Sequence, residues 1–209
     1  MSTKVRPAPL VLLALALAAA PTAAGEIALE VHGGYFEMAA ENSASALFDS
    51  GGGGTFGGAV RYTFWRGAFV SAGARTFSKE GERVYVAAPN APVQKLGFPL
   101  TLRLTPVFLT VGYRLREGKL IVPYAGIGGS VTAYKQESEV AGLAFDEDGS
   151  KAGFLGLAGV EVGRGTFRVG AEAGYSTVPG ALGLAEVSKV YGEDDLGGWH
   201  AVGKVVVAF

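Results

Sequence analysis

The most regular feature of the sequence is an alternation of apolar and polar residues that extends from Leu100 to Tyr134. A first alternating arm ends at the polar residues Arg116–Lys119, and a second arm begins after them. Alternation with a period of two is typical of a β-strand that has one apolar and one polar face. The stretch therefore predicts two antiparallel strands joined by a tight polar turn.

The same alternation recurs along the rest of the chain and predicts eight strands in all. Tight turns are expected at Arg66-Gly67, Arg116–Lys119 and Arg164-Gly165, and long loops at 38–54, 77–99, 135–149 and 177–197. Because tight turns and long loops follow one another in strict rotation, all tight turns lie at one end of the predicted sheet. The strands are predicted at 27–37, 55–65, 68–76, 100–115, 121–134, 151–163, 166–176 and 198–209.

The alternation changes phase at Pro106. Leu100, Leu102 and Leu104 form the apolar set before this proline, whereas Val107 and every second residue after it form the apolar set beyond it. Two halves of one strand that are out of phase by one residue require an extra residue between them. We therefore expect a β-bulge at Pro106, where the missing N–H of proline would be tolerated.

The charged residues of the strands indicate which face is turned inward. Eight such strands can form a soluble sandwich, a soluble ligand-binding barrel or a membrane barrel. A soluble barrel turns its apolar face inward, whereas a membrane barrel turns the same pattern inside out. An arginine facing lipid near the middle of the membrane would cost about 2–4 kcal/mol. Seven charged residues lie opposite the large apolar ones, namely Arg61, Arg75, Arg103, Arg114, Glu161, Arg168 and Glu172.

Three further features favour the membrane barrel. The polar faces are rich in Gly, Ser and Thr, which suit a narrow interior, and the tight turns all lie at one end. Aromatic residues lie towards the strand ends, as in interfacial girdles. We therefore predict an all-β fold: an eight-stranded antiparallel transmembrane up-and-down β-barrel with short periplasmic turns and long extracellular loops. The aromatic residues in question are Tyr35, Phe64, Tyr113, Tyr175 and Phe209.

The predicted lumen is strongly charged. A barrel of eight strands is just wide enough to be filled by its own side chains. Unpaired charges there would each cost several kcal/mol, so we expect a paired network with a structural role that plugs the lumen. The alternative is a narrow or gated pore for small solutes or ions, with a slight preference for anions. The network residues are Glu30, Arg61, Arg75, Arg103, Arg114, Glu161, Arg168, Glu172 and Lys204.

The N-terminus and the composition bear on the compartment. Lys4 and Arg6 precede an apolar run from Pro9 to Ala20 that is too short to span a membrane as a helix. Small residues follow, so we interpret residues 1–24 as a secretory signal peptide cleaved after Ala24, and residues 25–209 as one barrel domain. Cysteine is absent and the net charge is −1, which excludes disulfide scaffolds and offers no basic field for nucleic acid.

Several segments resemble a known family. They are FGGAVRYTFWRG (56–67), LTPVFLTVGYRL (104–115), VPYAGIGGSVTAYKQE (122–137) and the final VVVAF (205–209). Together they are similar to the bacterial outer-membrane β-barrel-domain family, which includes small OmpA-, OmpX- and OmpW-type barrels. The resemblance implies that the last strand, ending in Phe209, is an insertion signal read by the outer-membrane insertion machinery. It implies a monomer in the lipid of the outer membrane.

The sequence contains no convincing catalytic or metal-binding set. Some small outer-membrane barrels modify lipid A, but His32 and His200 have no serine placed beside them for a nucleophile–base pair. The acidic runs Asp146–Asp148 and Glu193–Asp195 lack the spacing of a calcium loop, so we expect no metal and no cofactor. We predict a non-enzymatic structural or surface-interaction protein, with a loop ligand that the sequence does not identify. A soluble lipocalin-like binding protein is the alternative fold.

Overall fold

The computed structural model describes residues 25–115, 120–140, 143–180 and 186–209. The predicted signal peptide and its cleavage site therefore lie outside the described residues. Two short helices, α2 (Glu41–Phe48) and α3 (Glu186–Tyr191), accompany the strands. The eight strands are β1 (Glu26–Met38), β2 (Gly52–Phe64), β3 (Ala68–Tyr85), β4 (Gln94–Arg114), β5 (Ile121–Val140), β6 (Leu143–Arg164), β7 (Phe167–Thr177) and β8 (Gly198–Ala208).

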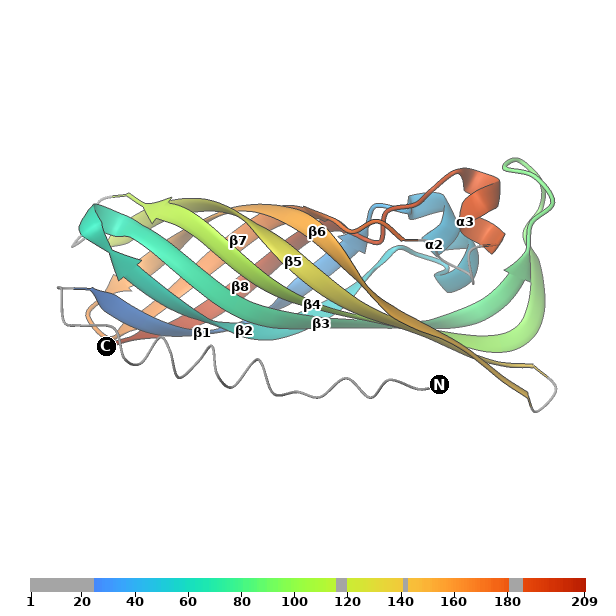
Figure 1. Ribbon diagram of the computed structural model, residues 1–209, viewed down its shortest axis with the longest axis horizontal. Helices are drawn as coiled ribbons and strands as arrows, with labels where there is room; N and C mark the ends of the chain where they lie inside the picture. Colours follow the sequence, from blue (N-terminus) through green and yellow to red (C-terminus); the bar gives the residue numbers. More distant parts are fainter. Residues whose placement is uncertain (1–24, 116–119, 141–142, 181–185) are drawn as a thin grey trace.

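The strands form a closed antiparallel barrel (Figure 1). Each strand pairs with the next one in the chain, and β1 pairs with β8 to close the ring. At the seam, the backbone N–H of Phe209 donates to the carbonyl of Ile27 at 2.8 Å, and the N–H of Ile27 donates back at 3.3 Å. The predicted eight-stranded up-and-down barrel is confirmed.

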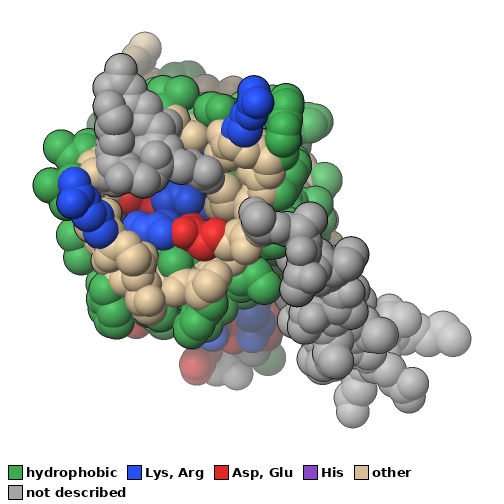
Figure 2. All heavy atoms as spheres, turned by 90° about the vertical axis from the view of Figure 1, so that its left-hand side faces the viewer, with side chains coloured by type: hydrophobic (Ala, Val, Ile, Leu, Met, Phe, Trp, Pro, Cys, Tyr) green, Lys and Arg blue, Asp and Glu red, His purple; other side chains and the backbone are tan. Residues whose placement is uncertain are grey.

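The two faces of the barrel are inverted relative to a soluble protein. Large apolar side chains point outward, and 63% of Val31 and 69% of Ile127 are exposed. Charged side chains point inward, and Arg61 is only 1% exposed. Seen from the tight-turn end, the charges lie inside a ring of hydrophobic side chains (Figure 2). Burying arginine while exposing valine and isoleucine is favourable only if the outside is hydrocarbon.

Two of the three predicted tight turns are described. Residues Trp65–Gly67 form a short 3-10 turn between β2 and β3. Gly67 has a φ of +102°, and a Cβ there would lie 2.3 Å from the carbonyl oxygen of Arg114, so only glycine fits. Gly165, with a φ of +68°, follows β6 and forms the turn into β7. The predicted turn at Arg116–Lys119 lies outside the described residues. We call this end of the barrel the turn end and the opposite end the loop end.

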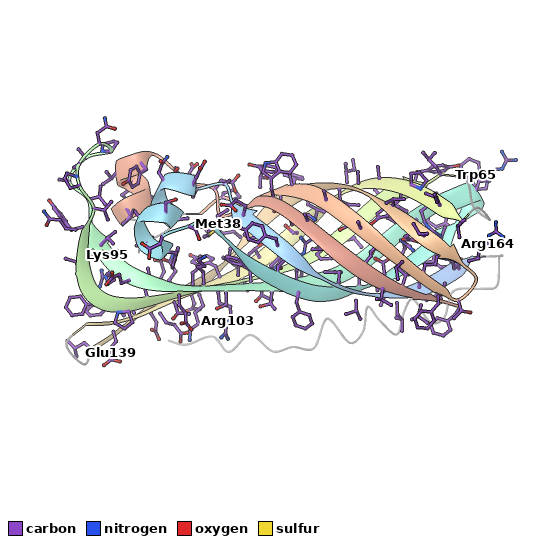
Figure 3. All side chains as sticks on the ribbon, turned by 180° about the vertical axis from the view of Figure 1, so that it is seen from behind. Met38, Trp65, Lys95, Arg103, Glu139 and Arg164 are labelled. Carbon is purple, nitrogen blue, oxygen red and sulfur yellow. The ribbon has the colours of Figure 1, made fainter. Side chains whose placement is uncertain are left out.

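Four strands are longer than the alternation predicts. Strands β3 to β6 continue past the closed ring as two protruding hairpins, so the segments 77–99 and 135–149 are mostly strand and not loop (Figure 1). Lys95 and Glu139 lie on these hairpins, far from Trp65 and Arg164 at the turn end (Figure 3). Lipid-facing alternation disappears where a strand leaves the membrane, and with it the sequence signal.

The predicted β-bulge at Pro106 is wrong. The register between β3 and β4 is the same on both sides of this proline, with Ala74 opposite Val107 and Phe77 opposite Leu104. Pairing of β4 with β5 is likewise continuous through Pro106. The register shift of β3 lies elsewhere, between Glu82 and Val84. The apparent change of phase arises because apolar residues before Pro106 point inward, whereas those after it point towards lipid.

The inward apolar residues belong to a hydrophobic core at the loop end, which we call the apolar cap. The sequence predicts only a long loop where helix α2 lies, but this helix folds over the barrel mouth together with α3 (Figure 1). No helix in the described chain is both long and apolar enough to cross a membrane. The larger buried side chains of the apolar cap are Phe36, Met38, Leu47, Phe48, Phe77, Val84, Val86, Leu100, Leu102, Leu104, Val178, Val187 and Leu196.

Glu193 fastens helix α2 to the segment after α3. Its carboxylate accepts hydrogen bonds from the backbone N–H groups of Asn42 at 3.0 Å and Ser43 at 2.8 Å, at the first turn of α2. Partial burial raises the pKa of Glu193, but these hydrogen bonds outweigh burial and leave the pKa below its ordinary value. The Asp195 carboxylate accepts from the N–H groups of Val178 and Gly197, which fixes the entry into β8.

Candidate functional site in the barrel lumen

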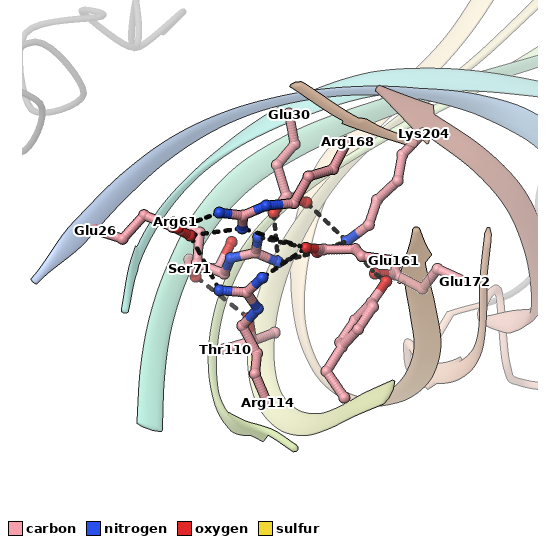
Figure 4. A network of polar contacts seen from close by, with 11 residues as sticks. Glu26, Glu30, Arg61, Ser71, Thr110, Arg114, Glu161, Arg168, Glu172 and Lys204 are labelled. Carbon is pink, nitrogen blue, oxygen red and sulfur yellow. Dashed lines mark hydrogen bonds and ion pairs between the residues drawn. The ribbon is translucent and has the colours of Figure 1, made fainter. Parts of the chain in front are cut away.

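Glu161, on β6, lies at the centre of the charged lumen. Its Oε1 is 2.5 Å from Nη1 of Arg61 on β2 and 3.3 Å from Nζ of Lys204 on β8. Its Oε2 is 2.9 Å from Nη2 of Arg114 on β4 and 3.7 Å from Nη1 of Arg168 on β7 (Figure 4). The Glu161 side chain is completely buried. One carboxylate therefore holds four cationic side chains from four different strands.

Two further carboxylates share the same cations. Glu30, on β1, lies 2.8 Å from Arg61 and 3.0 Å from Lys204. Glu172, on β7, lies 3.6 Å from Nζ of Lys204 and accepts a hydrogen bond of 2.8 Å from the Tyr124 hydroxyl. The structure thus brings together seven of the nine residues that the sequence places in the lumen network: Glu30, Arg61, Arg114, Glu161, Arg168, Glu172 and Lys204.

Glu26 and Tyr124 belong to this lumen network but were missed by the sequence analysis. Glu26 accepts from Nη1 of Arg114 at 3.0 Å and forms two hydrogen bonds with the Arg168 guanidinium. The alternation of β1 could have indicated that Glu26 points into the lumen, because Glu26 is in phase with Glu30. Tyr124 also lies under Nζ of Lys204, which is 4.1 Å from its ring centroid. The alternation could not indicate Tyr124 in the same way, because Tyr124 is uncharged and is in phase with glycines on β5.

Arg103 does not belong to the lumen, so its predicted placement is wrong. It is exposed on the outer side of β4, between the inward-pointing Leu102 and Leu104. The assumed phase change at Pro106 caused the error, because it turned Arg103 inward and the leucines outward. Figure 3 places Arg103 beside the loop-end part of the barrel. There the outer face is polar, so the exposed guanidinium of Arg103 does not face the hydrocarbon of the membrane.

Arg75 does point into the lumen but stands apart from the lumen network. It is 9% exposed, and within the described chain no carboxylate oxygen lies within ion-pair distance of its guanidinium. Its guanidinium carbon lies 5.5 Å from the ring centroid of Phe108, so an aromatic face is its main described contact. Arg75 is therefore the lumen cation without a carboxylate at ion-pair distance among the described residues, and Glu172 acts on its charge only from farther away.

The two histidines are buried in the lumen without a nucleophile. Nε2 of His200 lies 3.6 Å from Glu172, beyond hydrogen-bond length, and the His32 ring lies 6.4 Å from the ring of Phe108. Neither ring nitrogen of His200 has a hydrogen-bond partner in the described chain. No described serine is hydrogen-bonded to either histidine, so the described lumen does not contain the nucleophile–base pair of acyl-transfer catalysis.

The acidic runs do not form a metal site in the described chain. No group of three or more His, Asp or Glu side chains is placed to hold a metal ion within the described ranges. Asp146–Asp148 lie in β6, which pairs with β5. The carboxylates of Glu193 and Asp195 accept hydrogen bonds from backbone N–H groups.

The lumen network links seven of the eight strands across the interior. Charges of both signs are buried together. Glu26, Glu30 and Glu161 each meet at least two cations, and Glu172 meets Lys204. Burying such groups costs several kcal/mol per ion unless they are paired, and breaking one pair then costs about 3–5 kcal/mol. The arrangement can fill the lumen and fix the relative heights of distant strands.

The outer surface is arranged in bands. Trp65, Phe167 and Phe209 are exposed at the turn end, and Tyr35 and Trp199 are exposed towards the loop end. The apolar side chains of β1 to β8 lie between these two aromatic bands, as in the interfacial girdles of membrane barrels. The chain has the fold of a small outer-membrane β-barrel.

Solved structures of this class superpose on most of the chain. A major outer membrane protein from Thermus thermophilus matches with a TM-score of 0.62 at 11% sequence identity, covering 89% of this chain and 100% of that one. The N-terminal β-barrel domain of Pseudomonas aeruginosa OprF matches with a TM-score of 0.50 at 12% identity, covering 88% of this chain and 97% of that one. No protein-family model and no curated protein sequence matches the chain. At these identities the likeness concerns the fold.

Proposed function

We propose that this outer-membrane β-barrel is a non-enzymatic structural and surface-interaction protein whose lumen is closed to solutes. The observation that carries the proposal is the position of Glu161, completely buried and held by Arg61, Arg114, Arg168 and Lys204. Side chains that are paired across the interior leave no continuous aqueous path between the strands they join. The apolar cap closes the loop end a second time.

The surface-interaction part of the proposal rests on the two protruding hairpins. They present exposed apolar side chains beyond the closed ring, among them Tyr85, Leu96, Leu143 and Phe145. A rigid barrel that holds such hairpins outside the membrane is a suitable scaffold for contact with another surface. The ligand of this surface is unknown, and nothing in the described chain favours nucleic acid.

We further propose that the protein reaches the outer membrane through a signal peptide cleaved after Ala24 and a terminal insertion signal at Phe209. The described chain begins its first strand at Glu26, directly after the proposed cleavage site. N-terminal sequencing of protein from the outer-membrane fraction tests the cleavage. Deletion of Phe209 is expected to reduce the amount of heat-modifiable barrel in that fraction. Recovery of the wild type in the soluble fraction without detergent would favour a lipocalin-like protein instead.

Conductance measurements in planar lipid bilayers test the closed lumen. The wild type, refolded as a monomer, is expected to give no stable single-channel steps. The double variant Arg61→Ser/Glu161→Ser, which removes the central pair together, serves as the comparison because it leaves less side-chain volume in the lumen. Stable steps from the wild type would overturn the closed-lumen proposal and support the narrow or gated pore.

A further inference from the structure

A cavity lies in the lumen between the lumen network and the apolar cap. One side is lined by apolar cap residues, including Phe77, Leu104 and Leu196. The other side is lined by Arg75, Ser130, Thr132 and His200. These polar residues come from β3, β5 and β8, so the fold brings three strands together around one space.

The charge balance of the lumen leaves this cavity positive. Four carboxylates, those of Glu26, Glu30, Glu161 and Glu172, face five cationic side chains. Four of these cations are held within the lumen network, and the fifth is Arg75, which lines the cavity. Glu172 acts on Arg75 only from beyond ion-pair distance. A buried guanidinium without a carboxylate in contact is costly, so a bound anion at this position would be favoured.

Three other polar residues that line the cavity make no hydrogen bond in the described chain. The hydroxyls of Ser130 and Thr132 are buried and make no hydrogen bond. The two ring nitrogens of His200 make none either, although Nε2 lies 3.6 Å from a carboxylate oxygen of Glu172. Buried hydroxyl and imidazole groups are almost always hydrogen-bonded in folded proteins. Hydroxyl groups and an imidazole that line the same cavity as an arginine form a set of donors suited to an anion.

The size of the cavity limits the class of anion. It offers about 40 Å³ to the centre of a water-sized particle. One water molecule needs roughly 10–15 Å³ by the same measure, so the space admits one small ion with one or two waters. A solute much larger than about three water molecules is too large. We propose that the lumen contains a binding site for a chloride-sized monovalent anion, held by Arg75 with Ser130, Thr132 and His200.

Bromide is the probe that tests the site directly, because it scatters anomalously. Protein refolded into detergent micelles in sodium bromide is crystallised, and diffraction is measured at the bromine edge. We expect one anomalous peak inside the cavity beside the Arg75 guanidinium. A cavity that contains only water, with no anomalous peak, would overturn the proposal.

A stability measurement tests the same site in solution. Unfolding is followed by heat-modifiable gel mobility at equal ionic strength in chloride, bromide or gluconate, the last being too large to enter. At a halide concentration of about 100 times Kd, the folding equilibrium shifts about a hundredfold towards the folded state. The same stability in all three salts would contradict the site.

Three variants assign the effect to the cavity. Arg75→Met is expected to abolish the halide dependence, whereas Arg103→Met, the same change on the outer face of β4, is expected to retain it. If Arg75→Met does not fold, the double variant Ser130→Ala/Thr132→Val keeps the charge and is expected to weaken the dependence. Halide dependence that survives in both cavity variants would overturn the assignment.

Discussion

Nη1 of Arg61 lies 2.5 Å from Oε1 of Glu161, and Nη2 lies 3.2 Å from Oε2, so two fully buried side chains 100 positions apart in the sequence meet face to face. Bidentate pairing of this kind gives both energy and a fixed geometry. Because Glu161 also faces three other cations, it is the residue on which most of the lumen network depends.

Replacing Glu161 by glutamine is therefore expected to destabilise the barrel. The change removes the charge but almost no volume, and it leaves Arg61, Arg114 and Lys204 partly unpaired. The free energy of unfolding should fall by about 3–5 kcal/mol, measured by urea titration in detergent micelles. Glu137→Gln, on the exposed part of β5, is the matched control and should leave the unfolding midpoint almost unchanged. Equal effects of the two changes would contradict a central role for Glu161.

Single cysteines on β4 test the register through Pro106. The chain has no cysteine of its own, so each substitution introduces one thiol. In detergent-solubilised protein, Arg103→Cys should react rapidly with a water-soluble maleimide, whereas Leu102→Cys should be protected beneath the apolar cap. A bulge at Pro106 would reverse this order of labelling.

Truncation of Leu102 tests the apolar cap. This side chain is fully buried, so Leu102→Ala should lower the free energy of unfolding by about 2–5 kcal/mol, as expected for a cavity in a packed core. Leu109→Ala on the same strand is the control, because Leu109 is 54% exposed on the outer face. A larger loss for Leu109 than for Leu102 would argue against a packed core at the loop end.

The hydrogen bonds from helix α2 to Glu193 are expected to depend on pH. Burial opposes the charged form, but the donors Ser43 and Asn42 lower the pKa of Glu193 below its ordinary value of 4.5. A lowered folded-state pKa means that the stabilisation is complete above the ordinary value and is lost as the pH falls through the lower folded-state value. Amide hydrogen exchange in α2, corrected for intrinsic rates, should increase over that acidic range. Glu193→Gln should remove this pH dependence, and an unchanged profile in that variant would refute the assignment.

Alternation within single strands was sufficient to predict the barrel, because every strand that crosses the membrane must present apolar side chains to lipid. Val31, Ile127 and Phe167 face outward for this reason alone. The rule fails at Leu100–Leu104, where the outside is no longer hydrocarbon and the inside is apolar. The sequence carries no mark of the height at which a strand leaves the membrane, so the phase of Arg103 was misread together with the leucines around it.

The sequence indicates which side chains lie in the lumen better than it indicates which of them form ion pairs. The alternation of β2 and β6 predicted that Arg61 and Glu161 point into the lumen. Whether these two side chains meet depends on how β1 to β8 are staggered around the ring. That stagger is a property of the closed barrel and not of any one strand. It also decides that Glu26 meets Arg168, whereas Arg75 lies too near the apolar cap to meet a carboxylate.

The protruding hairpins have one further consequence. Within the described chain, pairing of β6 with β7 begins only at Phe154, so the earlier part of β6 has a free edge. A free edge offers unpaired N–H and C=O groups to a second molecule, and charged side chains oppose such pairing. Asp146, Glu147 and Asp148 lie on this edge, and two copies brought edge to edge would set like charges against each other. The opposite edge, on β3, is covered by α2, where a Cβ at Gly81 would lie 2.1 Å from the carbonyl oxygen of Leu47. One edge is thus shielded by a helix and the other by negative charge, so the long hairpins can protrude without stacking into a fibre.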